Sequence, residues 1–460
     1  MRRLALVTAL ALAWTGSASA DELSDLKAQL DSAKQLIQQL EKRVQALEAA
    51  PPAAAAPVAG APAASAPAAQ AAAPAVPSGG IVIAPNEVPA KGVTDANGAR
   101  LEIYGFAQAD FIYDFKRMDP DWSATLRPSK IPVVCTGPNP DPGCGDYGQT
   151  TFSVRQTRLG FKGFLPTEAG ELKTRFEFDL FGVGADAGQT TFRLRQAYGE
   201  LGPYLAGQTD SLFMDGSVFP NTIDYWGPGG MIFFRNIQAR YTPINGDGRK
   251  FSIALEAPGA AIDSGNAGTP YGWQAHNKYP DVTAQYRFEP EWGHLQAAGI
   301  VRYLGYQDPS FPTTDDSGYV TGYGLNLTGS YKVGRQDRIM AQFAYGKGIA
   351  GYFNDCCVDV APNSDGKAEA VPVVGWLVYY DHFWNERFSS AIGWSGQFQD
   401  NTDGQAATSF HSGQYGSTNL LYYPAKNVMT GMELLYGKRE NLDGESAYDT
   451  RVQFSTQFKF

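Results

Sequence analysis

The chain has 460 residues, of which 43% are hydrophobic and 18% charged, and its formal net charge at pH 7 is −10. This acidic balance argues against nucleic acid as a partner, because phosphates repel a negatively charged surface. Beyond the first twenty residues, no segment holds the run of about 18 apolar residues that forms a spanning helix. If the chain crosses a membrane, it must therefore do so as a closed β-barrel.

Residues 1–20 have the features of a secretory signal peptide. Residues 1–3 are a basic start, residues 4–14 are apolar, and the Ala-Ser-Ala of residues 18–20 fits a cleavage site. We expect the mature chain to begin at Asp21 and to be exported.

Four cysteines lie outside the predicted strands, and in an exported protein disulfides are expected. Cys135 and Cys144 bracket a loop rich in Gly and Pro, which suits a bridge between them. Cys356 and Cys357 are adjacent, so a bond between them would close a tight ring, and pairing across loops is left open. No His or Cys cluster suits a metal, and no cofactor is expected.

Residues 21–49 are predicted to form a periplasmic coiled coil. Apolar residues recur at alternating steps of three and four, which is the seam of a self-associating helix, with polar residues elsewhere. Residues 50–100 are a linker whose first thirty residues are almost entirely Ala and Pro, a composition that favours an extended spacer. The seam consists of Leu23, Leu26, Leu30, Ala33, Ile37, Leu40, Val44 and Leu47.

Residues 101–460 repeat one unit, a segment of alternating apolar and polar residues followed by a turn or loop. In the segment Leu172–Leu180, even positions are apolar or Thr and odd positions are charged. Such alternation indicates strands with one face in lipid and one in water. We predict an all-β transmembrane barrel of about sixteen antiparallel strands. The expected starts are near residues 101, 151, 171, 190, 203, 232, 249, 279, 292, 320, 337, 370, 386, 409, 426 and 450.

The final segment, Arg451–Phe460, alternates strictly and ends on an aromatic residue. This pattern resembles the signal by which the barrel-assembly machinery recognises outer-membrane barrels. We therefore expect a place in the outer membrane of a Gram-negative bacterium, in contact with its lipid and lipopolysaccharide. The first strand carries the small residues Gly105, Ala107 and Ala109 on its predicted outer face, which with the heptad helix favours a homotrimer.

Three early strands are predicted to stack basic residues on the lumen wall, because neighbouring strands lie about 4.8 Å apart. Charged rows of this kind set the solute preference of a pore. Glu177 and Asp179, on the same face, neutralise part of the charge. The predicted pore-lining bases are Arg158, Lys173, Arg175, Arg193 and Arg195, with Arg240 and Arg287 as extensions.

The segment from Thr209 to Met231 is too long for a turn and rich in aromatic residues and Pro, which favours an ordered functional loop. We expect it to fold into the lumen and to face the basic wall, giving a transverse field across an eyelet; an external loop is the alternative. Its predicted constriction residues are Asp210, Asp215, Phe219, Asp224, Tyr225 and Trp226.

Two stretches of this loop, Gly207–Asp215 and Phe219–Pro228, resemble the third-loop region of the DcaP-like trimeric porins, and Arg155–Lys162 resembles a stretch shared with general porins. The resemblance implies a trimeric channel with a periplasmic coiled coil that passes small anionic solutes such as dicarboxylic acids. Where many relatives carry Trp after Gly-Gln-Thr, this chain has Asp210, an added acid at the expected constriction.

Catalysis is not expected, because none of the four histidines lies beside a Ser in a recognisable constellation. The sequence thus predicts a porin for passive diffusion of small hydrophilic solutes, with a preference for anions. Two alternatives are a general porin with weak or cation selectivity, and a structural barrel whose coiled coil tethers the membrane to the cell wall.

Overall fold

The computed structural model describes residues 91–95, 98–182, 191–263, 265, 272–308 and 317–460. All of them belong to the second of two units into which the chain divides, 1–73 and 74–460. The predicted signal peptide, the predicted coiled coil and most of the linker lie outside the described residues. Within the described ranges, no helix is long and apolar enough to cross a membrane.

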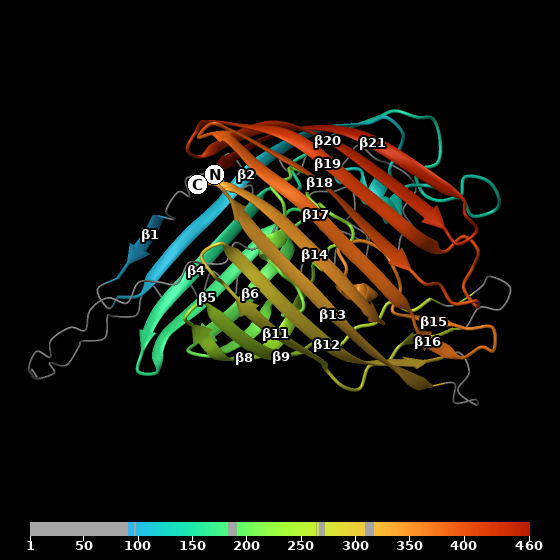
Figure 1. The fold of residues 1–460 in the computed structure, drawn as a ribbon, viewed down its shortest axis with the longest axis horizontal. Helices are drawn as coiled ribbons and strands as arrows, with labels where there is room; N and C mark the ends of the chain where they lie inside the picture. Colours follow the sequence, from blue (N-terminus) through green and yellow to red (C-terminus); the bar gives the residue numbers. More distant parts are fainter. Residues whose placement is uncertain (1–90, 96–97, 183–190, 264, 266–271, 309–316) are drawn as a thin grey trace, which may run out of the picture. The chain divides into compact units, whose positions relative to one another are not determined.

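Sixteen antiparallel strands close into a barrel, as predicted (Figure 1). Each strand pairs with its neighbours in chain order, and the last pairs with the first to close the ring. The strands are β2 (Arg100–Asp114), β4 (Arg158–Thr167), β5 (Gly170–Asp179), β6 (Arg193–Leu201), β7 (Tyr204–Asp210), β8 (Arg235–Gly246), β9 (Arg249–Glu256), β11 (Asp281–Phe288), β12 (Gly293–Gln307), β13 (Gly318–Val333), β14 (Asp337–Lys347), β17 (Pro372–Asn385), β18 (Phe388–Gln399), β19 (Phe410–Ala425), β20 (Val428–Asn441) and β21 (Ser446–Lys459).

The predicted starts follow the observed ones closely, apart from the second strand, which is interrupted. Its first part, β3 (Gln149–Ser153), and its second part, β4, both pair with β2, and residues 154–157 separate them. A short strand, β1 (Lys91–Thr94), lies within the segment predicted as linker. It pairs with Arg100–Ile103 at the start of β2, whereas β21 pairs with β2 from Phe106 onward. Another short strand, β10 (Gln274–Ala275), extends the wall beside β12.

The two faces of the wall differ as the alternation predicts. On β5, the side chain of Phe176 is 48% exposed on the outside, whereas Glu177 and Asp179 are buried inside the barrel. On β21, Phe454 and Phe458 are exposed on the outside. Gln453, which points to the other face of the strand, is fully buried. Apolar residues face lipid and polar residues face the lumen, as in outer-membrane barrels generally.

The last residue covers Gly105, one of the three small residues predicted on the outer face of β2, whereas Ala107 is exposed. The main chains of Gly105 and Phe460 exchange two hydrogen bonds, with N···O distances of 3.3 and 3.1 Å. A Cβ at Gly105 would lie 2.9 Å from the Phe460 ring and 2.3 Å from the Arg158 carbonyl oxygen. Glycine at this position therefore admits the terminal ring and the neighbouring strand.

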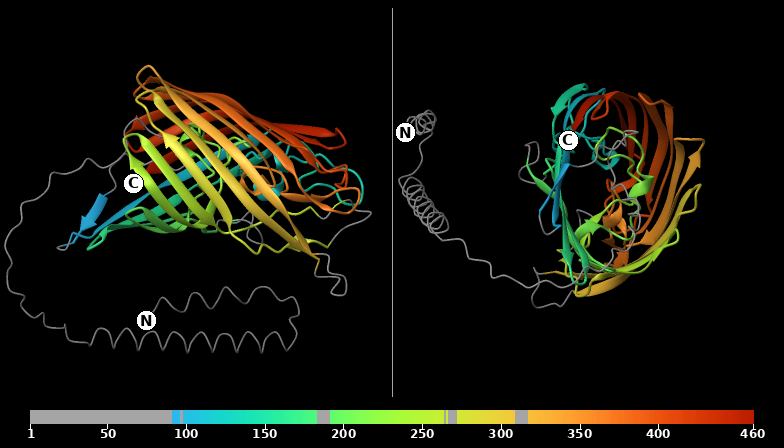
Figure 2. Two further views of the ribbon diagram at one scale, coloured as in Figure 1. Left: turned by 60° about the horizontal axis from the view of Figure 1, so that its bottom comes forward. Right: turned by 90° about the vertical axis from the view of Figure 1, so that its left-hand side faces the viewer.

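Short turns join the strands at one rim and long loops join them at the other. Three of the long loops, L1 (115–148), L3 (211–234) and L6 (348–371), send residues into the barrel, where Figure 2 shows chain segments inside the ring of strands. Apolar residues of L1 and L3 pack with side chains of the wall in one buried cluster. The loops contain the short helices η1 (Pro120–Trp122) and η2 (Pro128–Lys130) in L1, η4 (Gly216–Val218) in L3 and η5 (Ala350–Tyr352) in L6, and the hairpin of β15 (Val360–Pro362) and β16 (Ala368–Ala370) in L6.

Two disulfides lie in these loops. One joins Cys135 and Cys144 within L1, as the sequence suggested. The other joins the adjacent residues Cys356 and Cys357 in L6, so the pairing that the sequence left open is local rather than between loops.

Candidate constriction site

Four arginines and two acids form one cluster on the lumen face of β4, β5 and β6, which we call the arginine cluster. The strand register explains the grouping, because Asp179 is paired with Arg158 on one side and with Arg193 on the other. The guanidinium and carboxylate groups lie at these N···O distances: Arg195 to Glu177 2.7 Å and to Asp179 2.9 Å, Arg193 to Asp179 2.7 Å, Arg175 to Glu177 2.7 Å, and Arg158 to Glu177 3.7 Å.

Two local features of the backbone bring these groups together. A register shift between β5 and β6 after Glu177 leaves Arg195 as an extra residue, so that it reaches both acids. Gly160, which is paired with Glu177, leaves room for the Tyr104 ring, and the Tyr104 hydroxyl donates to Glu177 at 2.9 Å. The acids are therefore held by donors from three strands and are fully buried.

Positive charge exceeds negative charge in the arginine cluster, since four guanidinium groups face two carboxylates. Arg158 is 3% exposed, and its Nε and Nη1 have no hydrogen-bond partner among the described residues. Nη1 of Arg235 likewise has no hydrogen-bond partner among the described residues. The Arg235 side chain lies close enough to Arg158 and Arg195 to interact with their charges. Buried donors without acceptors are costly to the fold.

Tyr225 of L3 meets the arginine cluster from the lumen side. Its hydroxyl donates to Asp179 at 2.6 Å and accepts from Arg195 at 2.6 Å and from Arg193. Its ring stacks on Phe181, with centroids 4.0 Å apart. L3 thus presents a phenol to the basic wall, and Tyr225 is the predicted loop residue that contacts the arginine cluster.

Asp215 lies elsewhere, in a buried anchor of L3 on the opposite wall. Its carboxylate accepts from Arg287 at 3.1 Å, from His294 at 2.8 Å and from Thr328 at 2.6 Å, and also from Ser217 in η4. Burial alone would raise the pKa of Asp215, but the hydrogen bond from His294 and the charge of Arg287 hold it well below its usual range. Arg287, predicted to extend the basic wall, belongs to this anchor.

Asp224 forms a second anchor, between L3 and L1. It accepts from the Thr125 hydroxyl at 2.9 Å and from the Leu126 and Gly227 amides at 3.0 and 3.1 Å, while Arg451 is 3.9 Å away. Complete burial raises the pKa of Asp224 above its usual value, and these contacts only partly oppose the shift. Two of the three predicted acids of the loop, Asp215 and Asp224, are therefore buried in contacts with the protein.

Between these anchors L3 follows the wall. The Ile223 amide donates to Glu433 on β20 at 2.6 Å, and the Ile223 carbonyl accepts from Gln156 at 2.8 Å and from Gln453 at 3.1 Å. Phe219 is buried in the apolar cluster. L3 therefore thickens the wall from β9 round to β21 and leaves the arginine cluster on the remaining side.

Other predicted site residues lie around the cluster. Lys173 is half exposed and 3.6 Å from Glu200, and Arg240 donates to the Asp210 carbonyl at 2.7 Å. The Asp210 carboxylate accepts from Gln196 at 3.2 Å. The sequence contains no signal for Arg235, the first residue of β8, because its approach to the cluster depends on how L3 enters the strand.

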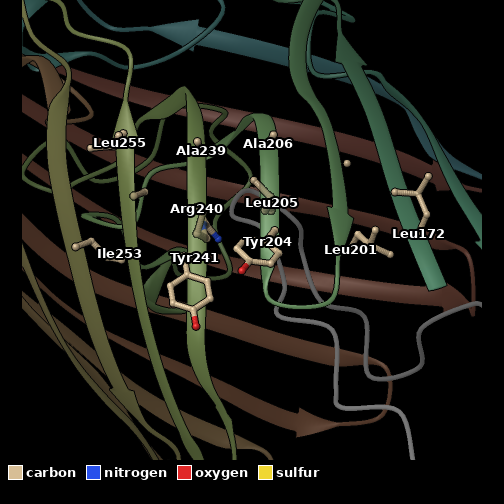
Figure 3. A pocket seen from close by; sticks show the side chains of 12 residues that line it. Leu172, Leu201, Tyr204, Leu205, Ala206, Ala239, Arg240, Tyr241, Ile253 and Leu255 are labelled. Atoms are coloured by element: carbon tan, nitrogen blue, oxygen red, sulfur yellow. The ribbon is translucent and has the colours of Figure 1, made fainter. Parts of the chain in front are cut away.

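One groove of the described barrel lies on its outer surface, away from the arginine cluster, and has a volume of about 640 Å³. Figure 3 shows it crossing β5 to β9. Its floor is a row of small residues in register, Gly199, Ala206 and Ala239, and large apolar side chains such as Tyr204 and Tyr241 border it. This groove lies on the outer face of the wall and not in the lumen.

A closed barrel of sixteen strands with an apolar outside, a polar lumen and a loop folded inward defines an outer-membrane porin. The chain belongs to the DcaP outer membrane protein family, whose sequence profile matches residues 90–460. Members of this family are channels of the outer membrane rather than enzymes.

Solved structures agree with this assignment. The outer membrane channel DcaP of Acinetobacter baumannii is similar, with a TM-score of 0.67 and 25% identity over 80% of this chain and 99% of that chain. OmpF of Salmonella typhi, solved with daunomycin, gives a TM-score of 0.52 and 12% identity over 80% of this chain and 100% of that chain, which is a likeness of fold alone. No curated protein sequence matches the chain closely enough to count as a relative.

Proposed function

We propose that this porin passes small hydrophilic anions, dicarboxylates among them, by passive diffusion through an eyelet between the arginine cluster and L3. The observation that carries the proposal is the excess of guanidinium over carboxylate groups beside Tyr225, with donors of Arg158 and Arg235 left without acceptors. A pore wall with such an excess attracts anions and repels cations.

The arginine chemistry favours carboxylates in particular. A guanidinium group offers a planar fork of donors that matches the two oxygens of a carboxylate. In the arginine cluster, Arg193 already binds Asp179 in this way, with Nε···Oδ1 at 3.1 Å and Nη2···Oδ2 at 2.7 Å. A solute carboxylate would exchange with such contacts in small steps, which permits both binding and release.

A general porin with weak or cation selectivity is the competing function, and specific residues favour it. Glu177, Asp179 and the added acid Asp210 all lie on this side of the lumen and reduce the positive excess. The sign of the selectivity therefore depends on whether the arginines outweigh these three acids.

The reversal potential of the purified protein in a planar bilayer under a salt gradient tests the proposal. We expect a potential of the sign that marks anion preference, reduced when succinate is added as a competing anion. A potential of the opposite sign would exclude the anion function and leave the porin assignment intact.

We also propose that the porin is a homotrimer and that the groove of Figure 3 faces a neighbouring copy. Two strands at the groove are short, since β7 has 7 residues and β9 has 8, whereas β13 has 16. A transmembrane strand needs about 9–11 residues, so a protein neighbour fits this side of the barrel better than lipid. The predicted coiled coil would hold the copies together in the periplasm.

Tryptophan substitutions test this contact. Ala206→Trp fills the groove floor and should convert trimers to smaller species in native gels. Ala341→Trp, a matched change on the outer face of β14, should leave trimers intact. Trimers that survive Ala206→Trp would place the contact elsewhere, for example on β2.

A further inference from the structure

We propose that Arg127 of L1 is a positioning residue that fixes Tyr225 at the eyelet by clamping L3 between L1 and L6. The inference rests on the proposed function in one respect, that the eyelet lies between Tyr225 and the arginine cluster. Arg127 does not touch the arginine cluster; it acts through Trp226 and Asp355.

The clamp begins with an arginine that lies against two indole rings. The Arg127 guanidinium lies 4.1 Å from the ring centroid of Trp122 in L1 and 4.4 Å from that of Trp226 in L3. The two ring centroids are 4.9 Å apart, in an edge-to-face arrangement. Cation–π contacts of this kind gain strength where water is excluded, and this side chain is only 13% exposed.

Asp355 ties the same arginine to L6. Its carboxylate accepts from Arg127 Nε at 2.9 Å and from the Ser129 amide and hydroxyl at 2.8 and 2.5 Å. Asp355 is 1% exposed, so its charge depends on these donors from L1. Arg127 is thus the one cation of the described residues in an ion pair with Asp355, and it contacts all three loops.

Trp226 is also held along its main chain and its indole. Its amide donates to Thr125 at 3.0 Å, and its indole Nε1 donates to the Asn354 carbonyl at 2.5 Å. The Asn354 amide in turn donates to the Trp226 carbonyl at 2.6 Å. L1 and L6 therefore grip Trp226 from both sides.

Tyr225 and Trp226 are neighbours with different partners. Trp226 is part of the clamp, whereas the Tyr225 hydroxyl contacts Asp179, Arg193 and Arg195. Fixing residue 226 therefore restricts residue 225. Loss of Arg127 would leave Asp355 with only the Ser129 donors and Trp226 without its cation, so Tyr225 would leave the arginine cluster more often.

Single-channel recordings of the full-length protein test the clamp. We expect Arg127→Ala to raise the frequency of current transitions by about a factor of five, the change that a small shift in a two-state equilibrium produces, and to move the reversal potential. Arg127→Lys should restore most of the wild-type behaviour, because Lys keeps the charge opposite Asp355. Arg439→Ala is the matched control, because its side chain is equally exposed and pairs with Asp141 of L1 at 3.3 Å. Arg439 also donates to the Ile131 carbonyl of L1, and within the described part of the chain it makes no hydrogen bond or ion pair with L3.

A double-mutant comparison shows whether Arg127 acts through Tyr225. If it does, Arg127→Ala should add little in a Tyr225→Phe background, because coupled residues are not additive. Should Arg127→Ala fail to fold, Trp122→Leu carries the same test, since it removes one of the two cation–π contacts and leaves the ion pair with Asp355 intact.

The two proposals fail in different ways. Currents of Arg127→Ala and Trp122→Leu that match Arg439→Ala, in a channel that prefers anions, would overturn the clamp alone. A wild-type channel that prefers cations, with extra transitions in Arg127→Ala, would overturn the anion function and support the clamp.

Discussion

The Asp215 anchor and the arginine cluster are both buried, yet they use charge in opposite ways. At Asp215, one carboxylate collects donors from Arg287, His294 and Thr328 on three neighbouring strands. In the arginine cluster, cations outnumber acids, and Arg158 keeps donors without acceptors among the described residues. Burial therefore does not distinguish the two regions, whereas the ratio of donors to acceptors does.

The difference separates a structural role from a role in transport. A buried charge whose partners are complete resists change, because removal of one partner leaves the others without compensation. A buried excess of donors attracts an acceptor from solution. L3 is held in place at the Asp215 anchor. At the arginine cluster its Tyr225 borders the proposed path of the solute.

The largest effect is expected from Asp215→Asn, which removes the charge that pairs with Arg287 and that is hydrogen-bonded to His294. Breaking a buried ion pair costs about 3–5 kcal/mol, so the free energy of unfolding in urea, measured in lipid vesicles, should fall by that amount. Released L3 should also raise the conductance. Asp403→Asn, in an exposed loop, is the control with the same loss of charge, and equal costs for the two variants would mean that Asp215 is no anchor.

The arginine cluster should respond in selectivity as well as in stability, because its arginines also pair with the buried Glu177 and Asp179. Replacing Arg175, Arg193 and Arg195 with Gln should reduce the preference for anions, measured from the reversal potential, by about tenfold, the lower end of what a focused field contributes. The matched variant replaces Arg335, Arg387 and Lys426 with Gln, which removes the same charge from exposed short turns. If both triple variants shift the potential equally, the total charge rather than the arginine cluster sets the selectivity.

The fold was predictable because its signal is local. In Leu172–Leu180 and in the last strand, successive residues alternate between apolar side chains that face lipid and polar side chains that face water. The turn residues between such segments indicate the number of strands. The grouping of Arg158, Arg175, Arg193 and Arg195 follows from strand order, together with the acids that face them.

The roles of the loop residues were not predictable in the same way. Asp215 and Asp224 meet their partners Arg287 and Arg451 across the lumen, and alternation gives no register for a loop. The clamp of Arg127, Trp226 and Asp355 joins three loops that no hydrogen-bonded ladder connects. A single extra residue at the register shift decides that Arg195 reaches both acids, and one residue leaves no periodic signal.

Acidification should separate two carboxylates of L3, Asp215 and Asp224, by how their contributions to stability change with pH. These pH-dependent changes are the smallest of the expected effects. The pKa of Asp215 is depressed, so its contribution to stability is present above its unfolded pKa and is lost as the pH falls through its lower folded value. The pKa of Asp224 is raised, so its ionised form destabilises the fold at neutral pH, and protonation on acidification returns that stability.

The costs of the two Asn variants should therefore change in opposite directions with pH. Asp224→Asn should cost about 1 kcal/mol at pH 7, because it exchanges acceptors for an amide that cannot replace all of them. This cost should grow on acidification, because the wild type gains stability that Asn cannot gain. The cost of Asp215→Asn should instead shrink once the pH falls below the unfolded pKa. Unfolding free energies of the wild type and both variants across the acid range provide the measurement, and parallel curves would show that the two carboxylates lie in equivalent environments.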